Sequence, residues 1–136
     1  MSRRWGASGI SVAAGIAVSA LCFTSCTSQP SYCADRAEAQ QSWQELTATD
    51  VIEDGTATLR DRFRQFSSDV EALAGSAQDE FQTEIDALRS SLQQMEGVLQ
   101  DVAGDAATAA PQVRPAIEDL ETSTQDLLGA VEQACE

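Results

Sequence analysis

The chain has 136 residues and a formal net charge of −14, with 22 acidic residues, eight arginines and neither lysine nor histidine. This length suits one small domain. The lack of histidine excludes serine–histidine catalysis and histidine-ligated metal centres. The acidic charge is unfavourable for nucleic acid, because affinity for phosphate comes from positive side chains, and we expect no nucleic-acid partner.

The N-terminus has the pattern of an export signal. Arg3 and Arg4 form a positive start, and residues 5–25 contain no charged side chain. A positive start followed by an apolar run and small residues is typical of a secretory signal peptide. We predict a signal peptide over residues 1–25. The two arginines hold the N-terminus inside, so the rest of the chain is expected outside the cytoplasm.

The end of this signal resembles the lipobox of bacterial lipoproteins. Phe23, Thr24 and Ser25 precede Cys26, and the small Thr24 and Ser25 fit the motif, whereas Phe23 stands where leucine is common. The resemblance implies cleavage before Cys26, lipidation of that cysteine and attachment to the membrane through the lipid. Two alternatives stay open: an ordinary secretory signal, or an uncleaved anchor, since residues 5–25 are long enough to cross a bilayer.

Two cysteines remain after this processing, because Cys22 lies in the signal and Cys26 carries the lipid. We expect a short tether over residues 26–32 and a folded domain over 33–136, with Cys33 and Cys135 at its ends. In an oxidising compartment these two cysteines predict a disulfide. The alternative is a redox-active pair, but such cysteines are usually close in sequence.

The composition after Cys33 favours helices, since alanine, leucine, glutamine and acidic residues dominate. Apolar residues recur at helical spacing from Leu59 to Ala77, and the pattern restarts at Phe81. The break is either a turn between two helices or a stutter within one long helix. A third periodic stretch covers residues 113–134.

Local signals set the expected ends of these helices. Asp50 and Glu53 are spaced as a capping box, and Gly55 follows as a turn signal. Residues 104–111 are expected to form a loop or frayed turn, because Pro111 and the nearby Pro115 suit a helix start and not a helix interior.

The fold class predicted from these patterns is all-α, an antiparallel up-down bundle of four helices near residues 33–48, 56–74, 79–103 and 112–135. This topology returns the C-terminus beside the N-terminus, where Cys33 and Cys135 can meet. The alternative is an elongated helical hairpin with one long central helix over residues 56–103, in which the two cysteines meet midway along the rod.

Little in the sequence points to chemistry. It contains no phosphate-binding loop, nucleophile motif or calcium loop, so we expect no enzymatic activity, no metal and no cofactor. Arg60 and Arg64 share a helix face, and we hypothesise that they contact an anion or a partner. The alternative is that they pair with acidic residues of a neighbouring helix. Trp43 is expected in the core.

The layout resembles small exported helical proteins and lipoproteins of high-GC Gram-positive bacteria. The resemblance is carried by the run Cys33-Ala34-Asp35, by Cys135 and by the lysine-free, alanine-rich composition. It implies an extracytoplasmic helical body and brings no activity with it. We hypothesise a non-enzymatic structural or interaction module with an envelope protein as partner. The alternative is a bundle that binds a small molecule or lipid. The sequence predicts no oligomeric state.

Overall fold

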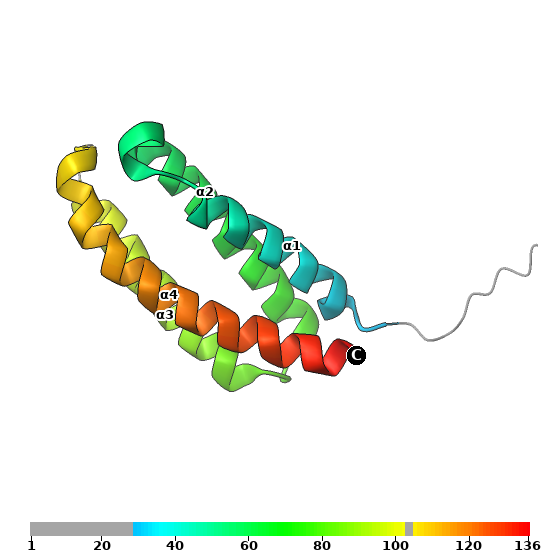
Figure 1. The fold of residues 1–136 in the computed structure, drawn as a ribbon. Coiled ribbons are helices and arrows are strands. Elements are labelled where there is room, and N and C mark those ends of the chain that lie inside the picture. Colours follow the sequence, from blue (N-terminus) through cyan, green and yellow to red (C-terminus); the bar gives the residue numbers. More distant parts are fainter. Residues whose placement is uncertain (1–28, 103–104) are drawn as a thin grey trace, which may run out of the picture.

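A computed structural model describes residues 29–102 and 105–136. The predicted signal peptide, Cys22 and the predicted lipidation site Cys26 lie outside the described residues. The described chain is all-α (Figure 1), and its four helices are α1 (Ser31–Thr47), α2 (Val51–Ala77), α3 (Gln82–Asp101) and α4 (Ala106–Cys135). None of these four helices has both the length and the apolar composition needed to cross a bilayer.

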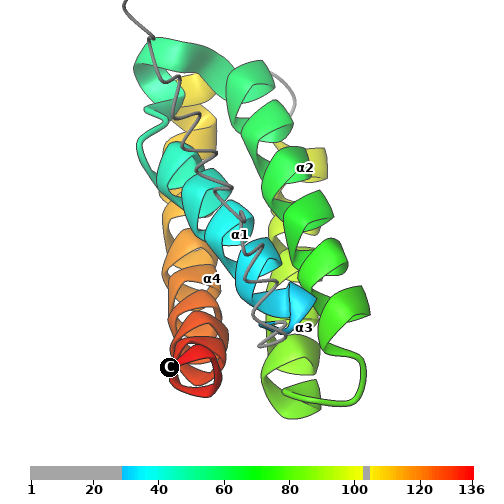
Figure 2. The same ribbon diagram turned by 90° about the vertical axis from the view of Figure 1, so that its right-hand side faces the viewer.

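The helices run up and down as two hairpins that pack against each other (Figures 1 and 2). Helix α1 lies closest to α2, and α3 lies closest to α4. The predicted antiparallel four-helix bundle is therefore confirmed. The alternative with one continuous central helix is wrong, because the chain reverses over residues 78–81, where Gln78 and Phe81 have positive φ angles of 52° and 59°.

The two ends of the bundle differ. At one end, the disulfide pole, Cys33 of α1 is bonded to Cys135 of α4 with their Cα atoms 5.9 Å apart, and the α2–α3 turn lies beside them. At the other end, the distal pole, are the α1–α2 connection (48–50), the end of α3 and the start of α4. The predicted disulfide is thus present, and such bonds are typical of oxidising, extracytoplasmic compartments.

The core is built from the apolar stripes that the sequence pattern predicts. Phe66 and Leu73 of α2, Met95 of α3 and Leu120 of α4 are almost completely buried. Trp43 of α1 packs on this core as expected, with its ring centroid 5.2 Å from that of Phe66. Four polar side chains of the described residues are also buried, Ser42, Thr56, Ser91 and Thr124, and Thr124 on the α4 stripe is completely so.

Helix α4 begins earlier than the sequence pattern predicts, at Ala106 and not near residue 112. Asp105 caps it, because its carboxylate accepts hydrogen bonds from the Thr108 hydroxyl and the Ala107 amide, which lower the pKa of Asp105. Alanines favour the helix, and the packing of buried Ala109 holds this first turn in place. Pro111 and Pro115 therefore lie inside a helix, and each removes one amide donor there.

The disulfide is expected to supply a large part of the stability. It closes a separation of 102 residues, and loss of such a crosslink costs about 2–5 kcal/mol in a small secreted domain. The Cys33→Ser/Cys135→Ser double variant should therefore unfold at clearly lower urea concentration than the oxidised protein. The wild type in reductant serves as the matched control and should follow the double variant; a midpoint equal to that of the oxidised protein would contradict this role.

Candidate functional site

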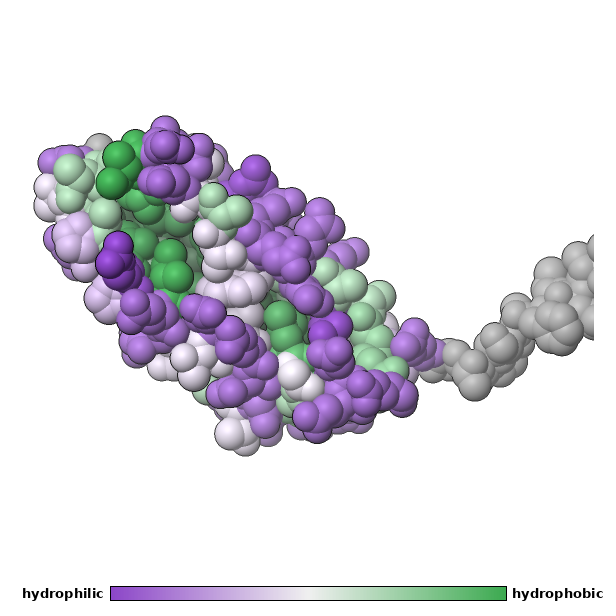
Figure 3. All heavy atoms as spheres, in the orientation of Figure 1, coloured by the Kyte–Doolittle hydropathy of each residue, from purple (hydrophilic) through white to green (hydrophobic). Residues whose placement is uncertain are grey.

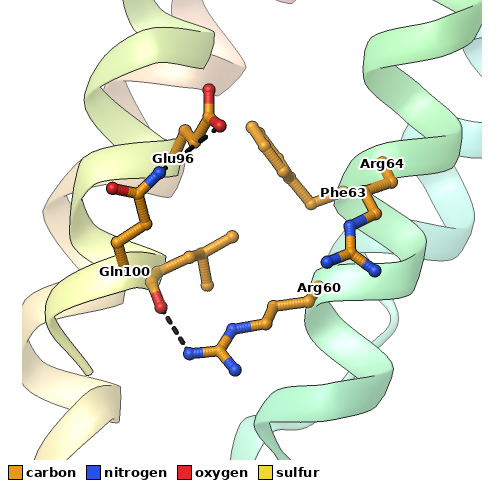
Figure 4. Close-up of a pocket in the computed structure, with 6 residues that line it drawn as sticks. Arg60, Phe63, Arg64, Glu96 and Gln100 are labelled. Atoms are coloured by element: carbon orange, nitrogen blue, oxygen red, sulfur yellow. Dashed lines mark hydrogen bonds between the residues drawn. The ribbon is translucent and has the colours of Figure 1, made fainter. Parts of the chain in front are cut away.

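Arg60 and Arg64, the predicted anion or partner contacts, lie on α2 at the edge of a groove of about 250 Å³ between α2 and α3 (Figure 4). Arg60 is half-buried, and its Nη2 atom donates hydrogen bonds to the carbonyl oxygens of Leu99 at 2.6 Å and Val102 at 3.0 Å. These are carbonyls at the C-terminal end of α3, where a cation is favourable. Arg60 therefore joins the two hairpins at the distal pole.

The neighbouring arginines are placed differently. Arg64 is exposed, and its nearest acidic partner is Asp61 on the same helix, at 3.4 Å. Arg62, which lies between Arg60 and Arg64 in the sequence and forms a basic cluster with them, pairs with Glu45 of α1. Neither Arg60 nor Arg64 makes the expected ion pair with a neighbouring helix of the described chain. The cluster is thus divided among a main-chain contact, an ion pair between helices and a solvent-exposed side chain.

Arg60 contacts α3 whereas Arg64 is exposed, so alanine substitutions at the two positions make a matched pair of variants. Arg60→Ala is expected to lower the free energy of unfolding by about 1–3 kcal/mol, because two half-buried carbonyl oxygens lose a charged donor. Arg64→Ala should change it by less than about 0.5 kcal/mol. Urea denaturation of both variants measures the difference, and equal effects would show that Arg60 does not join the hairpins.

Two further ion pairs connect the hairpins nearer the disulfide pole. Arg89 of α3 makes a two-pronged pair with Glu71 of α2, at 3.0 and 2.8 Å, and this hydrogen bonding lowers the pKa of Glu71. Arg36, one turn after Cys33, contacts Glu132 at 2.8 Å and the Leu128 carbonyl at 3.0 Å. The guanidinium nearest the disulfide in sequence is therefore engaged with α4.

A larger groove lies at the distal pole, between the α1–α2 connection and the first half of α4. Its volume is about 720 Å³, and Figure 3 shows hydrophobic residues along this hollow with hydrophilic residues at its borders. We call it the distal groove. Eleven residues line it: Thr47, Ala48, Thr49, Asp50, Val51, Ile52, Ala110, Val113, Arg114, Ile117 and Glu118.

Ile52 is the most unusual residue of this groove. Its exposed fraction is 69%, and among the described residues it is the one large apolar side chain left exposed. In a continuous helix, Ile52 would lie seven residues before buried Leu59 and so on the same face. The helix is interrupted at Gly55, whose φ of 85° is accessible to glycine. The turn before Gly55 therefore does not continue the axis of α2, and Ile52 does not lie on the buried face of Leu59.

The turn that carries Ile52 is held by its own capping contacts. The Asp50 carboxylate accepts hydrogen bonds from the amides of Ile52 and Glu53, so the predicted N-cap is present. The return bond of the predicted box comes from Asp54 and not from Glu53, since the Asp50 amide donates to the Asp54 carboxylate at 2.9 Å. Ile52 is thus presented on an ordered turn.

The rim of the distal groove carries three charged side chains: Asp50 on one side, and Arg114 and Glu118 on α4. Arg114 is exposed and forms no ion pair within 4.0 Å among residues 29–102 and 105–136. In the same ranges no three potential metal-ligating side chains gather. The groove therefore offers aliphatic surface and fixed charges, which suit binding.

Sequence reasoning missed the distal groove. Its two walls are about sixty residues apart, and each lies in a stretch that local signals assign to a connection or a helix end. One signal was available: Val51 and Ile52 are adjacent apolar residues in an otherwise polar cap. Comparison of the chain with protein-family models, with curated proteins and with solved structures finds no match.

Proposed function

We propose that the protein is an exported, non-enzymatic module of the cell envelope that binds a partner at the distal groove. The observation that carries this proposal is the position of the groove, which lies at the pole opposite the N-terminal tether. Gln29, where the described chain begins, donates a hydrogen bond to the Cys135 carbonyl at the disulfide pole. A lipid on Cys26 would therefore place the disulfide pole near the membrane and the groove away from it.

The sequence supports the export and anchoring part of this proposal. The charged start, the apolar run and the lipobox-like end before Cys26 are typical of lipoproteins. The disulfide agrees with an oxidising compartment. The resemblance to small exported helical proteins of high-GC Gram-positive bacteria points the same way.

A second candidate function is the binding of a small apolar molecule or lipid. A volume of about 720 Å³ falls within the range of small-ligand sites, which is about 300–1,000 Å³. Four aliphatic residues of the lining, Val51, Ile52, Val113 and Ile117, would contact such a ligand. The two candidates differ in whether the groove takes a protein segment or a single small molecule.

Intact mass of the purified native protein tests the anchor. The expected chain begins at Cys26 and carries a diacylglycerol adduct, with Cys33 and Cys135 two hydrogens lighter than in the reduced form. An unmodified mature chain would instead indicate an ordinary secretory signal, and an intact N-terminus would indicate an uncleaved anchor.

Site-specific photo-cross-linking tests the binding function. A photoreactive residue at position 52 is expected to form a protein adduct in the envelope, whereas one at exposed Asp79, at the disulfide pole, is not. Excess unlabelled wild-type protein should abolish the adduct, and excess Ile52→Glu protein should not. If both competitors act equally, or if position 79 gives the same adduct, the distal groove is not the binding site.

A further inference from the structure

Resting on the function proposed above, we infer that the occupant of the distal groove is an amphipathic helix of a partner protein with lysine or arginine residues beside its apolar stripe. The length of the groove suits such a helix. Its α4 wall extends from Ala110 to Glu118, about 12 Å at the helical rise. An amphipathic helix that docks with residues i, i+3, i+4 and i+7 spans about 10 Å.

The lining argues against the other common forms of peptide. A partner strand needs a free sheet edge, and residues 29–102 and 105–136 contain no strand. Proline-rich segments dock on aromatic surfaces, and none of the eleven lining residues is aromatic. Aliphatic walls contributed by helices instead suit the leucine-type side chains of an amphipathic helix.

The negative charge of the molecule favours a cationic partner. The described residues carry 22 carboxylates and six arginines, a net charge of −16. Around Ile52 the acids are especially close in sequence, since Asp50 lines the groove and Glu53 and Asp54 occupy the first turn of α2. An acidic field of this kind attracts a basic partner and orients it during encounter.

Two other occupants are disfavoured, one by its charge and the other by its length. A second copy of the chain brings the same net charge of −16, and like charges oppose association. The tether cannot reach the groove, because cleavage before Cys26 leaves residues 26–28 outside the structure, which span about 10 Å at most. Helix α1 alone separates the two poles by about 25 Å.

Arg114 distinguishes this occupant from an anionic amphiphile such as a fatty acid. A carboxylate head group would pair with Arg114 while its chain covers the aliphatic wall. A cationic helix would be repelled by Arg114 and attracted by Asp50 and Glu118. Reversing the charge at Arg114 therefore has opposite effects on the two classes of ligand.

The test uses a synthetic leucine–lysine peptide of about 18 residues, long enough to form a helix, and its counterpart with glutamate in place of lysine. Fluorescence anisotropy at physiological ionic strength measures the dissociation constants for the disulfide-bonded protein. The lysine peptide should bind and the glutamate peptide should not. Ile52→Glu should weaken binding at least about tenfold although it adds negative charge, because the apolar contact is lost.

Ala72→Glu is the matched control, because it adds the same charge at an exposed position of α2 outside the groove. This variant should bind the lysine peptide as the wild type does, and Arg114→Glu should bind it more tightly. Circular dichroism verifies that all three variants fold. Equal affinities of Ile52→Glu and Ala72→Glu, or equal binding of the two peptides, would overturn the inference.

A fluorescent fatty acid is the second probe and separates the two proposals. If it binds the wild type and is lost in Arg114→Glu, while the lysine peptide shows no dependence on Ile52, the cationic helix is wrong and binding at the groove stands. If neither probe binds and position 52 gives no competable adduct in the envelope, both the inference and the proposed function are wrong.

Discussion

The covalent bond between Cys33 and Cys135 is the constraint on which the architecture depends. Each helical hairpin packs closely within itself, and the two hairpins are joined to each other by fewer contacts. The bond fixes one end of the interface between the hairpins, and Arg36 adds contacts nearby with Glu132 and the Leu128 carbonyl. At the distal pole, grooves lie on both sides of the interface, and Arg60 spans one of them.

This difference between the poles gives the molecule a direction. Gln29, the first described residue, and the disulfide are at one end, and Ile52 is exposed at the other, on a turn fixed by Asp50 and Asp54. A single exposed apolar side chain is ordinary, but Ile52 lies beside Val51 and Ile117, and contiguous apolar surface commonly marks an interaction site. The proposed binding function follows from this position and not from any catalytic group.

Much of the fold could be predicted because the information is local. The apolar residues from Leu59 to Ala77 and from Phe81 to Val102 follow helical spacing, and they are nearly all buried, with Phe81 half-buried. The paired cysteines then limit how these helices connect. The early start of α4 could not be read in this way, because Gly104, Pro111 and Pro115 signal a loop, whereas capping by Asp105 and the packing of Ala109 favour the helix.

The candidate site was harder to predict, because it depends on contacts between distant segments. Residues 47–52 and 110–118 form one groove after the bundle assembles. The exposure of Ile52 depends on the non-helical backbone of Gly55, with φ 85° and ψ 165°, which no periodicity reveals. Conversely, Arg60 and Arg64 look equivalent in the sequence, and only the position of the end of α3 distinguishes them.

The location of the disulfide also has a mechanical consequence. Cys33 lies in the first turn of α1, and Cys135 is the last residue of α4. Tension applied between the residues before Cys33 and a load attached after Cys135 would pass through the sulfur–sulfur bond. The helices after Cys33 lie outside that force path, so such a pull would leave the bundle unstretched.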